Sequence, residues 1–143
     1  MSSGIEQLSP LLGDWVADSK AFSEGRGHTT VTLTEDSKLM RIHSVEDDQR
    51  FPESLMIVGA DEASDECTVL YYDSRDVYRV YRMALAEGEW RIWRDAPGFN
   101  QRYIGKLSDD GRSITGRWEF SEDGKSWKVD FDLNYTKAAG GHS

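Results

Sequence analysis

Turn signals recur along nearly the whole sequence at the spacing of short strands. Clusters of Asp, Glu, Ser and Gly interrupt the chain roughly every eight to twelve residues, and the segments between them are rich in Val, Ile, Thr, Tyr, Trp and Phe. Asp110-Gly111 and Asp123-Gly124 are typical of hairpins, because glycine supplies the positive φ that a tight hairpin turn requires. This rhythm predicts an all-β antiparallel meander in which consecutive strands pair.

The segments between the turn signals give about ten strands. They are expected at residues 14–18, 27–35, 38–46, 54–61, 66–73, 77–84, 88–95, 101–107, 112–120 and 126–136. Before them, Ile5, Leu8, Leu11 and Leu12 lie at helical spacing and predict a short N-terminal helical turn packed against one end of the sheet. We therefore expect one domain over residues 1–137 and a flexible C-terminal tail over 138–143.

Two late segments alternate strictly between apolar and polar residues. One face carries Trp127, Val129, Phe131, Leu133 and Tyr135 in the last strand, and Ile114, Gly116, Trp118 and Phe120 in the strand before it. Such strands place one face in a core and the other in water. A meander of this length can pack as a sandwich, but short sequential turns favour an up-and-down β-barrel, which has no free edges. Barrels of more than about eight strands begin to leave interior room for a ligand.

Charge and composition exclude several kinds of partner. The chain has 17 basic and 26 acidic residues, a net charge of −9, which disfavours nucleic acid and anionic membrane surfaces. Its single cysteine, Cys67, cannot form an intramolecular disulfide and is typical of a reducing compartment. The N-terminal segment lacks the features of a signal peptide, and no apolar run approaches the ~20 residues of a membrane-spanning helix. A soluble, cytoplasmic protein is expected.

Longer motifs carry a family resemblance. "LLGDW" (11–15) resembles the Gly-x-Trp opening of lipocalin-like barrels, in which the tryptophan plugs one barrel end. With "YYDSRDVYRVY" (71–81), "FNQRYIGKLSDDGRSITGRWEFSEDGKSW" (99–127) and "DFDLNYTK" (130–137), the chain resembles a bacterial family known as "domain of unknown function 1579". That family is similar to the calycins and, among them, to the ten-stranded nitrobindin-like haem barrels. The resemblance implies a lipocalin-like barrel and a possible homodimer, but no particular activity.

The residues needed for haem or for a metal site are poorly represented. Nitrobindin-like proteins hold the haem iron through a histidine on a late strand, whereas His28, His43 and His142 all lie outside the late strands 88–136. Haem therefore lacks its expected ligand, and no cofactor is expected. One cysteine and three scattered histidines also give no metal-ligand spacing.

No catalytic residue stands out either. The sequence has no Gly-x-Ser-x-Gly elbow. Cys67 shares a strand face with Val69 and Tyr71, which predicts a buried thiol rather than a reactive one.

Arginines alternate with aromatic residues in the strands at 77–84 and 88–95. Arg79 and Tyr81 share one face of the first strand, and Trp90 and Arg94 share one face of the second. If these faces point inward, the ligand-binding candidates are Arg79, Tyr81, Trp90 and Arg94, together with Tyr71 and Trp118 from neighbouring apolar faces. A buried arginine needs a partner, and Asp73, Asp95 and Glu119 are the candidates. If the faces point outward, the arginine stems cover apolar surface instead.

Three functions remain open at this point. The first is a barrel that binds a small hydrophobic or amphipathic ligand, which could be anionic and held by an arginine. The second is an enzyme of cyclase or isomerase type on the same barrel, and the third is a haem protein. The longest irregular connection, 94–103, carries Phe99 and is either a lid over the barrel mouth or a plain turn.

Overall fold

The computed structural model describes residues 4–21, 26–47 and 51–138. A short 3-10 helix, η1 (Gly4–Leu11), is followed by eleven strands. They are β1 (Gly13–Asp18), β2 (Gly27–Leu33), β3 (Met40–Glu46), β4 (Ser54–Ala60), β5 (Cys67–Asp73), β6 (Tyr78–Ala86), β7 (Glu89–Arg94), β8 (Asn100–Leu107), β9 (Ser113–Ser121), β10 (Lys128–Asp132) and β11 (Asn134–Lys137).

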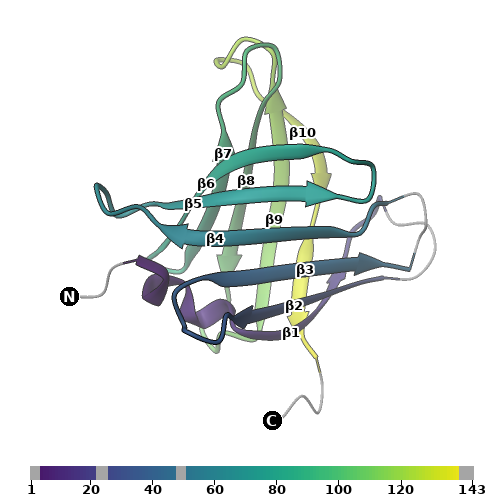
Figure 1. The fold of residues 1–143 in the computed structure, drawn as a ribbon. Coiled ribbons are helices and arrows are strands. Elements are labelled where there is room, and N and C mark those ends of the chain that lie inside the picture. Colours follow the sequence, from purple (N-terminus) through teal and green to yellow (C-terminus); the bar gives the residue numbers. More distant parts are fainter. Residues whose placement is uncertain (1–3, 22–25, 48–50, 139–143) are drawn as a thin grey trace.

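The strands form a closed antiparallel barrel (Figure 1). Consecutive strands pair from β1 to β9, and β11 closes the ring by pairing with both β9 and β1. Since β10 pairs with one half of β9 and β11 with the other, these two short strands together occupy the tenth position of the barrel. The predicted all-β barrel of about ten strands, with its short N-terminal helical turn, is confirmed.

A β-bulge divides the last predicted strand. The register with β9 shifts between Val129 and Phe131, so that Val129 lies opposite Glu119 and Phe131 lies opposite Trp118. One extra residue reverses which face the following side chains occupy. Val129 is consequently 61% exposed, whereas Phe131 faces the interior. The prediction of one continuous apolar face from Trp127 to Tyr135 was therefore wrong.

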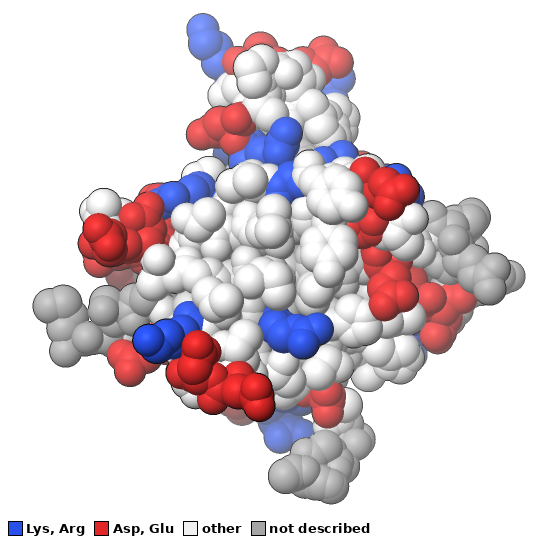
Figure 2. All heavy atoms as spheres, in the orientation of Figure 1, with Lys and Arg blue, Asp and Glu red and all other residues white. Residues whose placement is uncertain are grey.

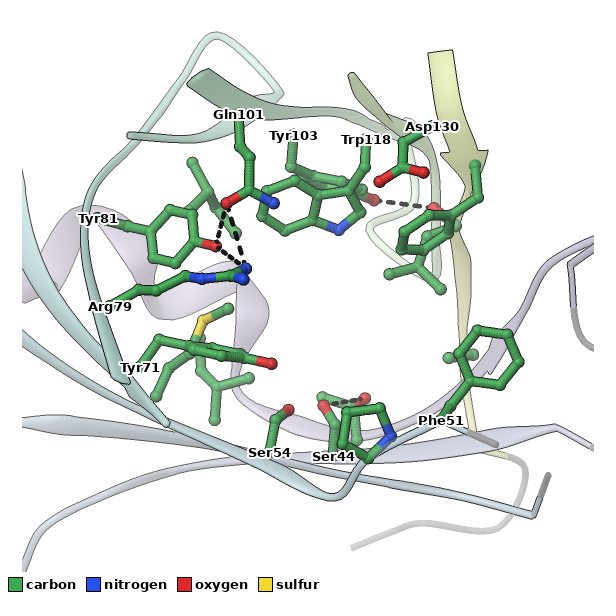
Figure 3. Close-up of a pocket in the computed structure, with 18 of the residues that line it drawn as sticks. Ser44, Phe51, Ser54, Tyr71, Arg79, Tyr81, Gln101, Tyr103, Trp118 and Asp130 are labelled. Atoms are coloured by element: carbon green, nitrogen blue, oxygen red, sulfur yellow. Dashed lines mark hydrogen bonds between the residues drawn. The ribbon is translucent and has the colours of Figure 1, made fainter. Parts of the chain in front are cut away.

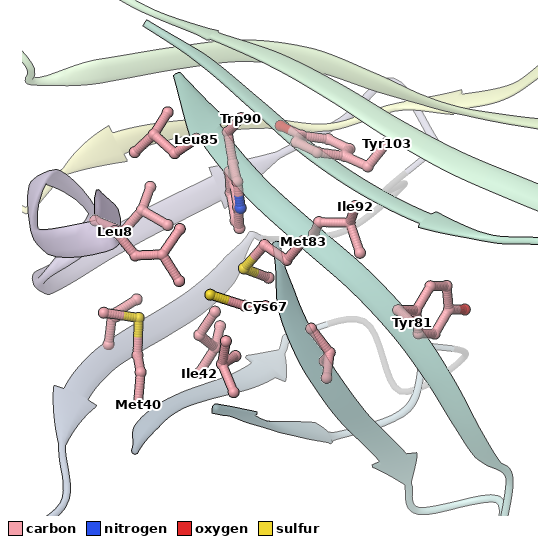
Figure 4. Close-up of a cluster of buried hydrophobic side chains, with 14 of the residues drawn as sticks. Leu8, Met40, Ile42, Cys67, Tyr81, Met83, Leu85, Trp90, Ile92 and Tyr103 are labelled. Carbon is pink, nitrogen blue, oxygen red and sulfur yellow. The ribbon is translucent and has the colours of Figure 1, made fainter. Parts of the chain in front are cut away.

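One end of the barrel is filled by apolar side chains (Figure 4). Leu8 and Leu11 of η1 are fully buried, and they join a core cluster that includes Met40, Cys67 and Met83. The side chain of Gln7 fixes η1 in place, because it donates to the carbonyl of Asp65 and accepts from the amide of Leu85. We call this the closed end.

Trp15 completes the closed end. It is 3% exposed, and its Nε1 donates to the carbonyl of Leu11 at 2.8 Å. The ammonium group of Lys137, at the end of β11, lies 4.7 Å from the centre of the Trp15 ring and donates to the carbonyl of Leu12. These contacts join the start and the end of the barrel, and Ala138 extends them through its amide, which donates to the carbonyl of Asp14. The rest of the predicted tail lies outside the described residues.

The outer surface of β5 and β6 is apolar and exposed. Leu70, Tyr72, Tyr78 and Val80 all project outward there, and the rings of Tyr72 and Tyr78 stack. Figure 2 shows that charged side chains lie mainly around the edge of this face. Among the described residues, no helix has the length and apolar character needed to cross a membrane.

Candidate ligand-binding cavity

A cavity of about 470 Å³ lies at the end of the barrel opposite η1 (Figure 3). In a meander, alternate connections meet at the same end, so the β3–β4, β5–β6 and β7–β8 connections come together here. They contribute Phe51, Arg75 and Phe99 to the cavity wall. We call this the open end.

Five of the six residues predicted to bind a ligand line this cavity. They are Tyr71 on β5, Arg79 and Tyr81 on β6, Trp90 on β7 and Trp118 on β9. The arginine and tyrosine of β6 thus point inward, which decides between the two directions that the sequence left open.

Arg94 is the sixth predicted residue, and it is not among those that line the cavity. It lies at the end of β7, opposite Gln101 in the register with β8. Its charge still acts on the cavity, because it opposes the rise that burial imposes on the pKa of Tyr81.

Aromatic rings form one wall of the cavity. Tyr81 meets Tyr71 edge to face, with ring centroids 5.8 Å apart, and meets Trp118 at 5.9 Å. Tyr103 continues the series, with its centroid 5.5 Å from that of Trp118. A wall of this kind offers several aromatic edges and faces against which a planar or apolar molecule can pack.

The wall also holds a polar cluster of Arg79, Tyr81 and Gln101. The Tyr81 hydroxyl donates to Gln101 Oε1 at 2.9 Å, and Arg79 Nη1 donates to the same oxygen at 3.3 Å (Figure 3). Tyr81 and Gln101 are both buried, whereas Arg79 is half-buried. Gln101 therefore orients both the phenol and the guanidinium toward the cavity.

A second polar cluster lies at the rim. The Asp73 side chain is fully buried, and it accepts from the Tyr71 hydroxyl at 2.6 Å and from Arg75 Nη2 at 2.6 Å. Burial alone would raise the pKa of Asp73, but the hydrogen bonds from Arg75 and Tyr71 outweigh it and hold that pKa well below its ordinary value. Asp73 also accepts from the backbone amide of Arg75, so it shapes the β5–β6 turn.

The tyrosines around the cavity remain protonated at neutral pH. Burial raises the pKa of Tyr71, Tyr81, Tyr103 and Tyr135, and for Tyr71 the neighbouring carboxylate of Asp73 adds to the effect. Their hydroxyls are thus suited to hydrogen bonding rather than to accepting a proton.

Two of the three predicted carboxylate partners, Asp73 and Glu119, bind other arginines, and Asp95 makes no ion pair with the described residues. Asp73 pairs with Arg75 rather than with Arg79. Glu119 projects from the outer face, where it pairs with Arg102 and Arg117 at 2.6 Å each. Those predictions were wrong because sequence spacing does not show which of several arginines a folded carboxylate will reach.

Neither described histidine lines the cavity. His43 projects outward from β3, where its Nε2 lies 2.6 Å from Glu53 Oε2, and His28 is exposed on β2. His142 lies outside the described residues. The described lining residues therefore do not supply the histidine that a nitrobindin-like haem site uses, and the described residues contain no cluster of three or more His, Cys, Asp or Glu side chains suited to a metal ion. Cys67 is buried in the core, as predicted.

Sequence reasoning missed several lining residues. Gln101 and Tyr103 on β8 are the most important, and Ser54, Asp130 and Tyr135 also line the cavity. The pairing of β7 with β8 could have identified the first two, since Ile92 lies opposite Tyr103 and an inward Ile92 requires an inward Tyr103. No comparable signal marks Asp130, which the β-bulge turns toward the cavity rim.

Comparison with known proteins adds no further identification. No protein-family model matches the chain, and no curated protein matches it. The family resemblance therefore stays a prediction.

Proposed function

We propose that this protein binds a small hydrophobic or amphipathic molecule inside the barrel. The observation that supports the proposal is the cavity of about 470 Å³, whose wall combines aromatic rings with a small polar cluster. Binding sites for small molecules generally have volumes of about 300–1,000 Å³ and the same mixture of apolar surface and few polar groups.

The arrangement of the two ends also supports binding. The closed end is filled by side chains that do not line the cavity, such as Leu8, Met40 and Met83, so the open end does not have to be packed tightly. Protonated tyrosines and a fixed glutamine are groups that orient a ligand. This combination favours a binding protein over a cyclase or an isomerase, because the groups on the aromatic wall donate hydrogen bonds and do not accept protons.

Tryptophan fluorescence can test the proposal. Of the five tryptophans, Trp90 and Trp118 line the cavity and the other three do not. The neutral fluorophore phenylnaphthylamine should bind with enhanced emission and should quench part of the tryptophan emission. Trp118→Phe should remove much of this quenching, whereas Trp93→Phe, a change on the outer side of β7, should leave it in place.

A cavity-filling variant provides the decisive control. Ser54 points into the cavity from β4 (Figure 3), so Ser54→Phe should fill the space and abolish binding. Thr30→Phe adds the same ring to an exposed position of β2 and should bind the fluorophore as the wild type does. Undiminished binding by Ser54→Phe, or no binding by the wild type to any compound in a panel of fatty acids and aromatic acids, would refute the proposal.

A further inference from the structure

We infer that the ligand is an anion with an aromatic or conjugated body, and that Arg79 and Gln101 hold its anionic group. This inference depends on the proposed function, because it concerns the same cavity.

The hydrogen bonds within the polar cluster leave donors available. Arg79 can only donate, so the Gln101 atom that faces it must be the amide oxygen, and this fixes the orientation of the amide. That oxygen already accepts from both Arg79 and Tyr81. The amide nitrogen of Gln101 and the other guanidinium nitrogens of Arg79 make no further hydrogen bond to the described residues. The cluster can therefore receive acceptor atoms.

The charge of Arg79 is also not neutralised within the cavity. Arg75 has the buried carboxylate of Asp73 at 2.6 Å, whereas no carboxylate of the described residues lies within 4.0 Å of the Arg79 guanidinium. A half-buried cation without a counter-ion is unfavourable, particularly in a chain that otherwise has an excess of carboxylates. A bound carboxylate or sulfonate would supply the missing charge and accept two parallel hydrogen bonds.

Two acidic side chains define how the anion is oriented. Glu46 and Asp130 also line the cavity, and Figure 3 shows Asp130 across the cavity from Arg79. An anionic group is therefore attracted to the Arg79 side and repelled from the opposite side. Tyr71 lies opposite Arg79 in the register of β5 with β6, and the Tyr81 ring contacts the rings of both Tyr71 and Trp118. The body attached to the anion would therefore pack against aromatic rings.

A pair of fluorophores can test the inference directly. Anilinonaphthalene sulfonate and phenylnaphthylamine have the same aromatic body, but only the first carries an anionic group. The wild type should bind the sulfonate about 10- to 100-fold more tightly than the neutral compound, as expected for charge-assisted hydrogen bonds. Arg79→Met should abolish this preference, because it should weaken binding of the sulfonate far more than binding of the neutral compound.

Matched variants separate the local effect from the loss of net charge. Arg41→Met removes a positive charge from the exposed outer face of β3 and should leave the preference intact. Gln101→Glu should remove the preference too, because it replaces donors with a carboxylate. Retained binding of phenylnaphthylamine shows that each variant is folded. Arg79→Lys keeps the positive charge and should retain part of the preference for the sulfonate.

The outcomes distinguish this inference from the proposed function. If the wild type binds the two fluorophores equally, or if Arg79→Met weakens both by the same factor, the inference is wrong and the proposed function stands. If Ser54→Phe still binds the sulfonate, the sulfonate binds outside the cavity and the inference is wrong. If neither fluorophore binds and no other compound does, the proposed function itself fails.

Discussion

The two ends of the barrel differ in what fills them. At the closed end, Leu8, Leu11 and Trp15 bury apolar surface that needs no specific partner. At the open end, Asp73 and Gln101 are buried as well, but each is held by directional hydrogen bonds. Apolar side chains can pack until the space is filled, whereas buried polar groups must keep their bonding geometry.

This difference explains why the cavity described above lies at the open end. The polar clusters fix Arg79, Tyr81 and Tyr71 in place, so these side chains cannot collapse into the remaining space. Stability should therefore depend mainly on the closed end, and ligand affinity mainly on the open end. The following variants test this division, beginning with the largest expected effect.

Replacing Trp15 should be the most damaging change. Trp15→Ala removes a fully enclosed indole, its hydrogen bond to Leu11 and its contact with Lys137, so the free energy of unfolding should fall by about 3–5 kcal/mol. Urea unfolding measures the change. The folded fraction should still bind phenylnaphthylamine, because Trp15 does not line the cavity. A loss of less than about 1 kcal/mol would contradict the importance of the closed end.

Gly116 on β9 lies against Tyr103 of the cavity wall, and a side chain there has no room. A Cβ atom at Gly116 would lie 2.7 Å from the carbonyl oxygen of Ile104 and 2.6 Å from Cζ of Tyr103. Gly116→Ala should lower the free energy of unfolding by about 1–3 kcal/mol and, by displacing Tyr103, should also weaken binding. Thr115→Ala, on the outer face, is the control and should change stability by less than about 0.5 kcal/mol.

Protonation of Asp73 should lower the free energy of unfolding at acid pH. Its pKa in the folded state is held low, so the carboxylate stabilises the fold above about pH 4, the ordinary value for Asp, and this contribution is lost as the pH falls below it. Asp73→Asn should cost about 1–3 kcal/mol at neutral pH, and the difference from the wild type should shrink on acidification. Urea unfolding over a series of pH values measures this difference in the free energy of unfolding. Asp109→Asn, at an exposed position of the closed end, is the control.

Phe99 should affect binding more than stability. It is 41% exposed at the cavity mouth, and the guanidinium of Arg79 lies 5.8 Å from its ring centre. Phe99→Ala should change the free energy of unfolding by less than about 0.5 kcal/mol but weaken sulfonate binding by about 2- to 5-fold. Stopped-flow measurement of the dissociation rate would show the effect, and an unchanged rate would indicate a plain turn rather than a lid.

The strands and their order could be predicted because turn residues and β-branched or aromatic residues act locally. Asp110-Gly111 and the alternation around Trp118 are visible in the sequence without reference to the rest of the fold. The same local signals predicted the burial of Cys67 and the helical turn that contains Leu8.

The composition of the cavity wall depended on contacts between segments far apart in the sequence. Period two divides β6 into two faces, but both faces contain arginine and aromatic residues, so only closure of the barrel places Arg79 and Tyr81 inside. The choice of Arg75 as the partner of Asp73, and the bulge that turns Val129 outward, likewise follow from the packed geometry. The sequence determined the strands, and the tertiary structure decided which of their faces form the site, because burial of a mixed face depends on all its neighbours at once.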